Sequence, residues 1–339
     1  MAPDSNRRKT RSMASTQTVP AATASAPEEA SLRHLPVGIF GASMGVFGFA
    51  LALRAAGFAG FSAAMQWVGV AFFLLLAGAY ATKAVLHPAD TKAEWNHPVR
   101  IAFFPAISIS VLLLATLLVE HQPGIATVLW MIGAAAHAVL TVLVVTQWIG
   151  HRPFQPMHLS PAWFIPAVGN VIVPLAGVRL GHAEISWYFL SVGLLFWIVL
   201  LTIVFNRLIF HDPMPGRLKP TMVILVAPPA VAFLAWLQLN GGAVDDFARI
   251  LINIGYVFAL IVAVQLPAIL RLPFALSFWA LSFPLAAIAT ASFRFAALTG
   301  SAFHLWTGYA LLAALALAIV GLAVRTVQVT LAGQVFRPE

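Results

Sequence analysis

The sequence contains no cysteine and very few charged residues. Asp, Glu, Lys and Arg together make up 9% of its 339 residues, whereas soluble globular domains carry roughly 25%. The absence of cysteine excludes disulfides, thiol nucleophiles and cysteine-ligated metal sites. The shortage of charge leaves too little polar surface for a protein that is surrounded by water, so we expect a membrane protein.

Acidic residues are absent from the middle of every long apolar run. Proton pumps and many ion-coupled carriers bury carboxylates as relays, and cation channels use carboxylate rings or a carbonyl filter such as TVGYG. Neither feature is found here, and the HExxH and Walker A motifs are absent too. His137, inside an apolar run, is interpreted as a packing residue. The sequence therefore predicts no enzyme, no cofactor and no cation pore.

Ten apolar runs, each near the 20 residues that span a bilayer, fill most of the chain. They lie at 36–56, 62–86, 100–119, 124–148, 162–181, 185–209, 220–240, 247–270, 273–297 and 302–330. We predict an all-α integral membrane protein with a ten-helix channel domain at 34–330. A disordered cytoplasmic tail at 1–33 and a short cytoplasmic tail at 331–339 flank it. The fifth run is the weakest, because Asn170 and two prolines interrupt it.

Basic residues gather on one side of this predicted arrangement. Of the 19 Lys and Arg residues, fifteen fall in the two tails and the even-numbered loops. The other four are Arg54, Arg179, Arg249 and Arg294. Because cytoplasmic loops are richer in Lys and Arg, both termini are predicted to be cytoplasmic, in a multi-pass protein of the cell inner membrane. Charges confined to loops also argue against a nucleic-acid partner, despite the net charge of +8.

The N-terminal tail is rich in Ser, Ala and Thr and contains a cluster of basic residues. No apolar stretch follows that cluster directly, so it is not a secretory signal peptide. We interpret it as a disordered tail, and an organelle transit peptide is the alternative.

Prolines recur in alternate apolar runs, 56 to 69 residues apart. They are Pro36, Pro105, Pro166, Pro228 and Pro284. This period predicts five tandem helical hairpins. A proline inside a helix removes one backbone hydrogen bond and kinks the helix. In lipid the freed carbonyl needs water or a protein partner. Pro105, for example, would free the carbonyl of Ile101. We therefore predict an inner ring of odd-numbered helices around a wet axis, and an outer ring of even-numbered helices against lipid.

Small residues and prolines on the odd-numbered runs are the predicted lining of that axis. They are Gly41, Gly45, Gly48, Pro105, Ser108, Pro166, Gly169, Pro228 and Pro229. The alternative for each glycine is that it only allows helices to pack closely. A neutral lumen with basic mouths favours anions over cations, and an aromatic ring can close such a lumen by hydrophobic occlusion.

Four separate stretches resemble the tellurite-resistance and dicarboxylate transporter family, which includes bacterial TehA proteins and the plant guard-cell slow anion channel. They are His34–Gly41, Val168–Gly177, Phe210–Pro229 and Leu276–Leu285, in the family's order. The resemblance covers about residues 33 to 330. It implies a homotrimer in which each protomer passes chloride, nitrate and similar small anions through its own pore.

The resemblance also implies a gate, formed by a phenylalanine next to a proline on the ninth helix. Phe283 beside Pro284 matches this pattern. Phe274, Phe278 and Trp279 are nearby aromatic residues that compete for the assignment.

Two other classes of function stay open at this point. A carrier for dicarboxylates, tellurite or sulfite is one, and it is weakly disfavoured because repeats in carriers usually form two large halves. A membrane enzyme or structural subunit is the other, and the runs contain no cluster of nucleophile, base or metal ligands to support it.

Overall fold

The computed structural model describes residues 31–150, 154–333 and 335 of the chain, and these residues form helices and connecting turns with no strand. The predicted all-α membrane fold is therefore confirmed. The predicted disordered tail lies outside the described residues except at its end, where Leu32–His34 form a short 3₁₀-helix. The predicted C-terminal tail is described only at 331–333 and 335.

Nine helical segments in the described part of the chain are long and apolar enough to cross a membrane. They are Val37–Ala55, Ala59–Leu86, Arg100–Leu118, Pro123–Ile149, Ala183–Phe210, Gly216–Leu239, Asp246–Leu270, Leu276–Thr299 and Ala302–Leu331. The run predicted at 162–181 corresponds to a shorter apolar segment, Pro161–Gly177. Proline and Asn170 divide that segment into short pieces, so a count of ten spans stays a prediction.

The odd-numbered spans differ from the even-numbered ones in local structure. Each begins with a 3₁₀ segment and continues as an α-helix. The pairs are η2 (Val37–Ile39) with α1 (Phe40–Ala55), η3 (Arg100–Phe103) with α4 (Pro105–Leu118), η7 (Gly216–Val226) with α9 (Ala227–Leu239), and η8 (Leu276–Leu281) with α11 (Ser282–Thr299). The fifth span alternates twice, through η5 (Pro161–Trp163), α6 (Phe164–Val168), η6 (Gly169–Ile172) and α7 (Pro174–Gly177).

Proline explains where these segments change. Pro105 is the first residue of α4, and Pro228 and Pro284 lie in the first turns of α9 and α11. A proline is tolerated there because the N–H that it lacks has no partner within the helix. The Ile101 carbonyl, predicted to be free, instead accepts a bond from the N–H of Phe104 at 3.4 Å. The predicted kink is thus a change of helix type, which reuses the freed carbonyl in a tighter turn.

The even-numbered spans are single uninterrupted helices. They are α2 (Ala59–Leu86), α5 (Pro123–Ile149), α8 (Ala183–Phe210), α10 (Asp246–Leu270) and α12 (Ala302–Leu331). A short helix, α3 (Pro88–Asn96), connects the first hairpin to the second.

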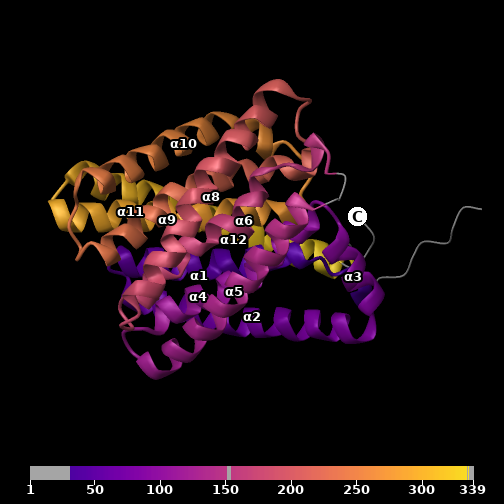
Figure 1. Ribbon diagram of the computed structural model, residues 1–339, viewed down its shortest axis with the longest axis horizontal. Helices are drawn as coiled ribbons and strands as arrows, with labels where there is room; N and C mark the ends of the chain where they lie inside the picture. Colours follow the sequence, from indigo (N-terminus) through magenta and orange to yellow (C-terminus); the bar gives the residue numbers. More distant parts are fainter. Residues whose placement is uncertain (1–30, 151–153, 334, 336–339) are drawn as a thin grey trace, which may run out of the picture.

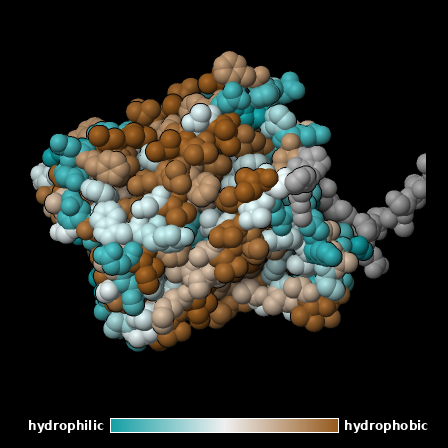
Figure 2. Space-filling model, viewed as in Figure 1, coloured by the Kyte–Doolittle hydropathy of each residue, from teal (hydrophilic) through white to brown (hydrophobic). Residues whose placement is uncertain are grey.

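The odd-numbered helices form a closed inner ring. Contacts run from α1 to α4, through the fifth span to α9, then to α11 and back to α1, and each even-numbered helix packs on the odd-numbered one before it. The four long odd-numbered spans are 67–72% buried, against 22–33% for the even-numbered ones. In Figure 1, α10 and α2 form opposite edges of the view with α1 and α9 between them. Figure 2 shows hydrophobic residues across the middle of the visible face, as lipid contact requires.

Small and hydroxyl side chains hold the inner ring together. A β-carbon added at Gly45 would lie 2.0 Å from the Oγ of Ser282, so α1 and α11 are in direct contact there. Ser43 on α1 and Ser110 on α4 share a hydrogen bond of 2.7 Å between their hydroxyl oxygens. Close approach and hydrogen bonds between helices are the main sources of packing energy where lipid replaces water.

A buried ion pair fixes the beginning of the first span. The Nζ of Lys83 on α2 donates to the Oε2 of Glu94 on α3 at 2.7 Å, and both side chains are 3% exposed or less. The other carboxylate oxygen accepts from the backbone N–H of Val37 at 2.7 Å, and Tyr80 donates to Oε2 at 2.9 Å. Lys83 also donates to the carbonyl of Leu35. These bonds anchor residues 35–37, directly before the wall of the central cavity.

Candidate pore

Two cavities follow the axis of the inner ring and share part of their walls. One lies toward the beginnings of the odd-numbered spans and the other toward their ends, and Phe283 and Val231 line both. Phe283 comes from the first turn of α11 and Val231 from the first half of α9. The two cavities therefore meet at the level of these side chains.

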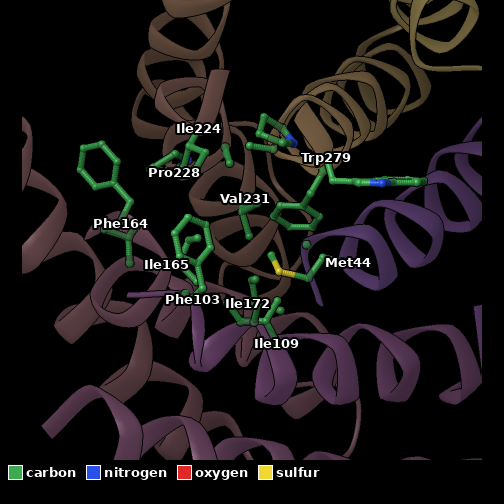
Figure 3. Close-up of a pocket in the computed structure, with 18 of the residues that line it drawn as sticks. Met44, Phe103, Ile109, Phe164, Ile165, Ile172, Ile224, Pro228, Val231 and Trp279 are labelled. Carbon is green, nitrogen blue, oxygen red and sulfur yellow. The ribbon is translucent and has the colours of Figure 1, made fainter. Parts of the chain in front are cut away.

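The cavity toward the beginnings of the odd-numbered spans, here the apolar cavity, is narrow. Its volume is about 70 Å³. Every odd-numbered span contributes to its wall, and Figure 3 shows Met44, Ile172 and Val231 converging on it from α1, η6 and α9. Further lining residues are Gly38, Phe103, Ala106, Ile109, Phe164, Ile165, Val168, Val171, Ile224, Ala227, Leu276, Ser277, Trp279 and Ala280. A small space with hydrocarbon walls is the setting in which a pore excludes water.

The second cavity, here the arginine vestibule, is much wider, at about 500 Å³. It lies toward the ends of the odd-numbered spans. Three arginines from three different odd-numbered spans line it, together with one carboxylate: Arg54, Arg179, Arg294 and Glu120. These four residues carry a summed charge of +2. The vestibule is thus the charged part of the axis, and its charge is positive.

Glu120 lies between two of these arginines. Its Oε1 is 3.0 Å from an amino group of Arg179, and its Oε2 is 3.9 Å from an amino group of Arg54. Arg54 also donates to the carbonyl of Leu117 at 2.6 Å, near the end of α4, where the helix dipole favours a cation. The side chain of Arg294 is exposed, and within the described residues it has no ion pair or hydrogen bond.

The neighbours of Glu120 set its ionisation. Burial alone would raise the pKa of Glu120, but the hydrogen bond and charge of Arg179, with the charges of Arg54 and His121, outweigh it. The net result is a pKa below the usual value of 4.5. The side chain is therefore a carboxylate at neutral pH.

Glycine makes room for Phe283 beside α1. A β-carbon added at Gly48 would lie 3.2 Å from the Cδ2 of Phe283 and 2.9 Å from the β-carbon of Ala286. Among the competing aromatics, Trp279 lines the apolar cavity but not the vestibule. Phe274 and Phe278 pack against each other with ring centroids 5.7 Å apart, and they line neither cavity. Phe283 is thus the aromatic side chain common to both spaces.

The other predicted lining residues divide into two groups. Gly41, Gly169, Pro228 and Pro284 line the apolar cavity, and Gly48 lines the vestibule. The remaining ones are buried in the wall and line neither of the two cavities: Gly45, Pro105, Ser108, Pro166 and Pro229.

Hydrogen bonds and packing account for three members of that second group. Gly45 packs on Ser282. The Oγ of Ser108 lies 2.9 Å from the Nδ1 of His137, so its hydroxyl bonds outward to α5. The carbonyl of Pro166 accepts a bond from the hydroxyl of Thr141, also on α5, at 2.7 Å.

His137 is fully buried behind the apolar cavity. Its Nδ1 is bonded to Ser108, while its Nε2 has no hydrogen-bond partner among the described residues. A β-carbon added at Gly169 would lie 2.6 Å from its Cε1, so the glycine provides the space that the imidazole fills. In the described part of the chain, no three His, Asp or Glu side chains gather as a metal site would need.

Sequence reasoning missed the vestibule. It counted Arg54, Arg179 and Arg294 only as loop charges, although each lies at or near the end of an odd-numbered run. That position was a usable signal, because the ends of the ring helices surround the mouth of any central pore. The aliphatic wall of the apolar cavity carried no such signal, since its residues are the same types that face lipid.

Comparison with known proteins gives a consistent family. Residues 34–327 match the SLAC1 family, described as voltage-dependent anion channels. The chain is 30% identical over 243 residues to the S-type anion channel SLAH3 of Arabidopsis thaliana and 29% identical over 239 residues to SLAH2 of the same plant. It is 27% identical over 273 residues to a tellurite resistance protein TehA homolog of Haemophilus influenzae.

The extent of these matches differs between the relatives. The match to SLAH3 covers 70% of this chain but 38% of SLAH3, and the match to SLAH2 covers 68% and 45%. The chain thus spans less than half the length of these plant proteins. The match to the TehA homolog covers 77% of this chain and 81% of the homolog.

Proposed function

Because this chain belongs to the SLAC1 family of voltage-dependent anion channels, we propose that it forms a pore for small anions such as chloride and nitrate. The observation that carries the proposal is the pair of axial cavities that meet at Phe283 and Val231. A ring of five helical segments encloses them, and the wider one is positively charged. Such a path attracts anions and repels cations.

Phe283 is the proposed gate of this pore. Its ring separates a wide charged vestibule from a narrow apolar cavity, and a dry constriction of this kind stops ions until it is wetted or widened. The Phe283 side chain is partly buried, so moving its ring fully into water costs less than the about 3 kcal/mol of a completely buried phenylalanine. The closed state would then be favoured over the open one by up to about a hundredfold.

The test is the current carried by Phe283→Ala. Expressed in oocytes or reconstituted in planar bilayers, this variant is expected to conduct more than the wild type, by up to about a hundredfold on the same estimate of the gate. Its reversal potential should follow the chloride or nitrate gradient and ignore the sodium gradient. Phe274→Ala is the matched control, because Phe274 lines neither cavity and its removal should leave the pore closed.

Two results would overturn the proposal. One is a Phe283→Ala variant that reaches the membrane, keeps its fold and carries no more current than wild type. The other is a current that reverses at the sodium potential.

A carrier for dicarboxylates, tellurite or sulfite is the second candidate. The name of the Haemophilus influenzae relative refers to tellurite resistance. Carriers and channels differ in kinetics, so flux that is slow and saturates with substrate, in place of an open-pore current, would favour this candidate.

We further infer a homotrimer in the cell inner membrane with cytoplasmic termini and ten spans, the fifth being the broken segment Pro161–Gly177. The family resemblance supports the trimer, and the excess of basic residues on the side of the termini supports the orientation. Cross-linking of purified protein would test the trimer. Protease protection of a tag at each terminus would test the orientation.

A further inference from the structure

We propose that the arginine vestibule contains a binding site for a small monovalent anion, and that Glu120 acts as a tethered anion that masks part of this site. The inference rests on the proposed function, because it assigns a first binding step to the same axis. It adds a named set of ligands, Arg54, Arg179 and Arg294, and a residue that limits their affinity.

The first observation is that the vestibule already holds an anionic group. The carboxylate of Glu120 lies between Arg179, at 3.0 Å, and Arg54, at 3.9 Å. Guanidinium groups bind oxyanions and carboxylates through charged N–H donors. The arrangement shows the chemistry that this part of the vestibule accepts, and a mobile anion must compete with Glu120 for it.

The second observation is that the positive charge exceeds what Glu120 neutralises. Arg294 lines the same cavity, its side chain is exposed, and it has no ion pair or hydrogen bond among the described residues. The other two arginines of the cavity are partly neutralised by Glu120. Arg294 is therefore the arginine of this set that is available to a mobile anion. We therefore place the mobile anion beside Arg294.

The third observation is the size of the vestibule. Its volume of about 500 Å³ is many times the roughly 10–15 Å³ of cavity space that holds one water. An anion can enter with most of its water, so binding requires little dehydration. In such a wet site the arginines act mainly through charge, and the affinity should depend on the sum of charges.

Charge arithmetic then gives the role of Glu120. Replacing Glu120 by Gln raises the summed charge of the four residues from +2 to +3. In a water-filled site, one unit charge about 4 Å away changes affinity by about fivefold. Arg294→Gln should therefore bind chloride about fivefold more weakly than wild type. Glu120→Gln should bind it more tightly, by at most about fivefold, because Glu120 lies beside Arg179 and Arg54.

The experiment measures chloride binding directly on the purified full-length protein in detergent. The broadening of the ³⁵Cl magnetic resonance line is recorded against chloride concentration, and nitrate is added to displace the bound ion. Arg249→Gln is the control for Arg294→Gln, since Arg249 is an exposed arginine of α10 over the Phe295 ring and does not line the vestibule. Glu184→Gln, at the exposed start of α8, is the control for Glu120→Gln.

Support requires weaker binding in Arg294→Gln, tighter binding in Glu120→Gln and unchanged binding in both controls. Arg294→Lys keeps the charge and should keep the affinity within about twofold. The inference is overturned if Arg294→Gln binds chloride as wild type does, or if Arg249→Gln loses as much affinity as Arg294→Gln.

A second measurement separates this inference from the proposed pore. In the Phe283→Ala background, the chloride concentration at half-maximal current is compared with and without Arg294→Gln. If Phe283→Ala carries no current while chloride binding follows the pattern above, the pore fails and the site stands. If the current flows and Arg294→Gln shifts neither the line broadening nor the half-maximal concentration, the site fails and the pore stands.

Discussion

Gly48 on α1 faces Phe283 and Ala286 on α11 so closely that a β-carbon at Gly48 would lie 3.2 Å from the Phe283 ring and 2.9 Å from the Ala286 methyl. Overpacking of this kind costs about 1–3 kcal/mol. We expect Gly48→Ala to lower the free energy of unfolding by that amount, measured by titration with denaturing detergent in mixed micelles.

The companion variant Ala286→Gly identifies the contact responsible. On its own it should cost about 1 kcal/mol, because glycine is unfavourable inside a helix. Combined with Gly48→Ala it removes the opposing methyl. The double variant should therefore lose less stability than the two single variants lose together. Strict additivity would show that the two positions do not touch.

The buried pair of Lys83 and Glu94 predicts a larger effect. Removing one partner of a buried ion pair leaves the other charge uncompensated, at a cost of about 3–5 kcal/mol. Lys83→Met should therefore unfold at a markedly lower concentration of denaturing detergent than wild type. The double variant Lys83→Met with Glu94→Gln should recover part of the lost stability. The exposed Lys92 on α3 is the control. A loss in Lys92→Met equal to that in Lys83→Met would contradict this account.

The alternation of inner and outer helices could be predicted from the prolines that recur inside alternate predicted runs, whereas Pro123 precedes its run and begins the outer helix α5. Pro105, Pro228 and Pro284 lie in the first turns of α4, α9 and α11, the buried helices of the ring. The form of the interruption could not be predicted, because a freed carbonyl such as that of Ile101 can bind water or take a 3₁₀ partner. Local sequence does not distinguish these two outcomes; the packing around the helix decides between them.

The candidate site was predictable to a different degree at its two ends. Phe283 followed from a resemblance, and its neighbour Gly48 from a glycine face on the first run. Ser108 was assigned to the axis from its depth in the span, yet its hydroxyl bonds to His137 on the neighbouring helix. Depth along a helix does not fix which side a residue faces, and hydrophobic periodicity is weak in a helix that is buried on nearly all sides.

Acidification should expose the contribution of Glu120 to stability. Because its pKa in the folded protein is below the usual 4.5, the carboxylate stabilises the fold above pH 4.5, and this contribution is lost as the pH falls through the lower, folded value. We expect the gap in thermal midpoint between wild type and Glu120→Gln to be constant near neutral pH and to shrink below pH 4.5. Glu184 has no ion pair among the described residues, so Glu184→Gln should show no such gap. A gap that widens on acidification would mean that folding raises the pKa of Glu120 and does not lower it.

Ser108 is expected to be structural through its bond to His137. The Nε2 of His137 already lacks a partner, so Ser108→Ala would leave both ring nitrogens buried and unbonded. The loss of a partner for a buried polar group costs about 1–3 kcal/mol, which detergent unfolding can measure. Ser191→Ala on the exposed face of α8 is the control, because within the described part of the chain that hydroxyl bonds only to the carbonyl of Trp187 in its own helix. Equal stability of Ser108→Ala and wild type would show that water already serves the imidazole.

Val231 separates two ways in which the constriction could be closed. It lines both cavities and is 2% exposed. Val231→Thr keeps the size of the side chain but adds a hydroxyl. If the Phe283 ring blocks the path by its volume, Val231→Thr alone stays silent. In the Phe283→Ala background the same hydroxyl offers the ion a hydrogen bond, worth about two- to tenfold in current.

Val231→Ile provides the opposite change in the same background. It adds one methylene to the wall without any polarity, so it should reduce the Phe283→Ala current. Whole-cell currents normalised to surface expression would measure all four variants under one chloride gradient. If the single variant Val231→Thr conducts as well as Phe283→Ala, the exclusion of water from the constriction keeps the pore closed, and the volume of the Phe283 ring does not. The gate would then belong to α9 as much as to α11.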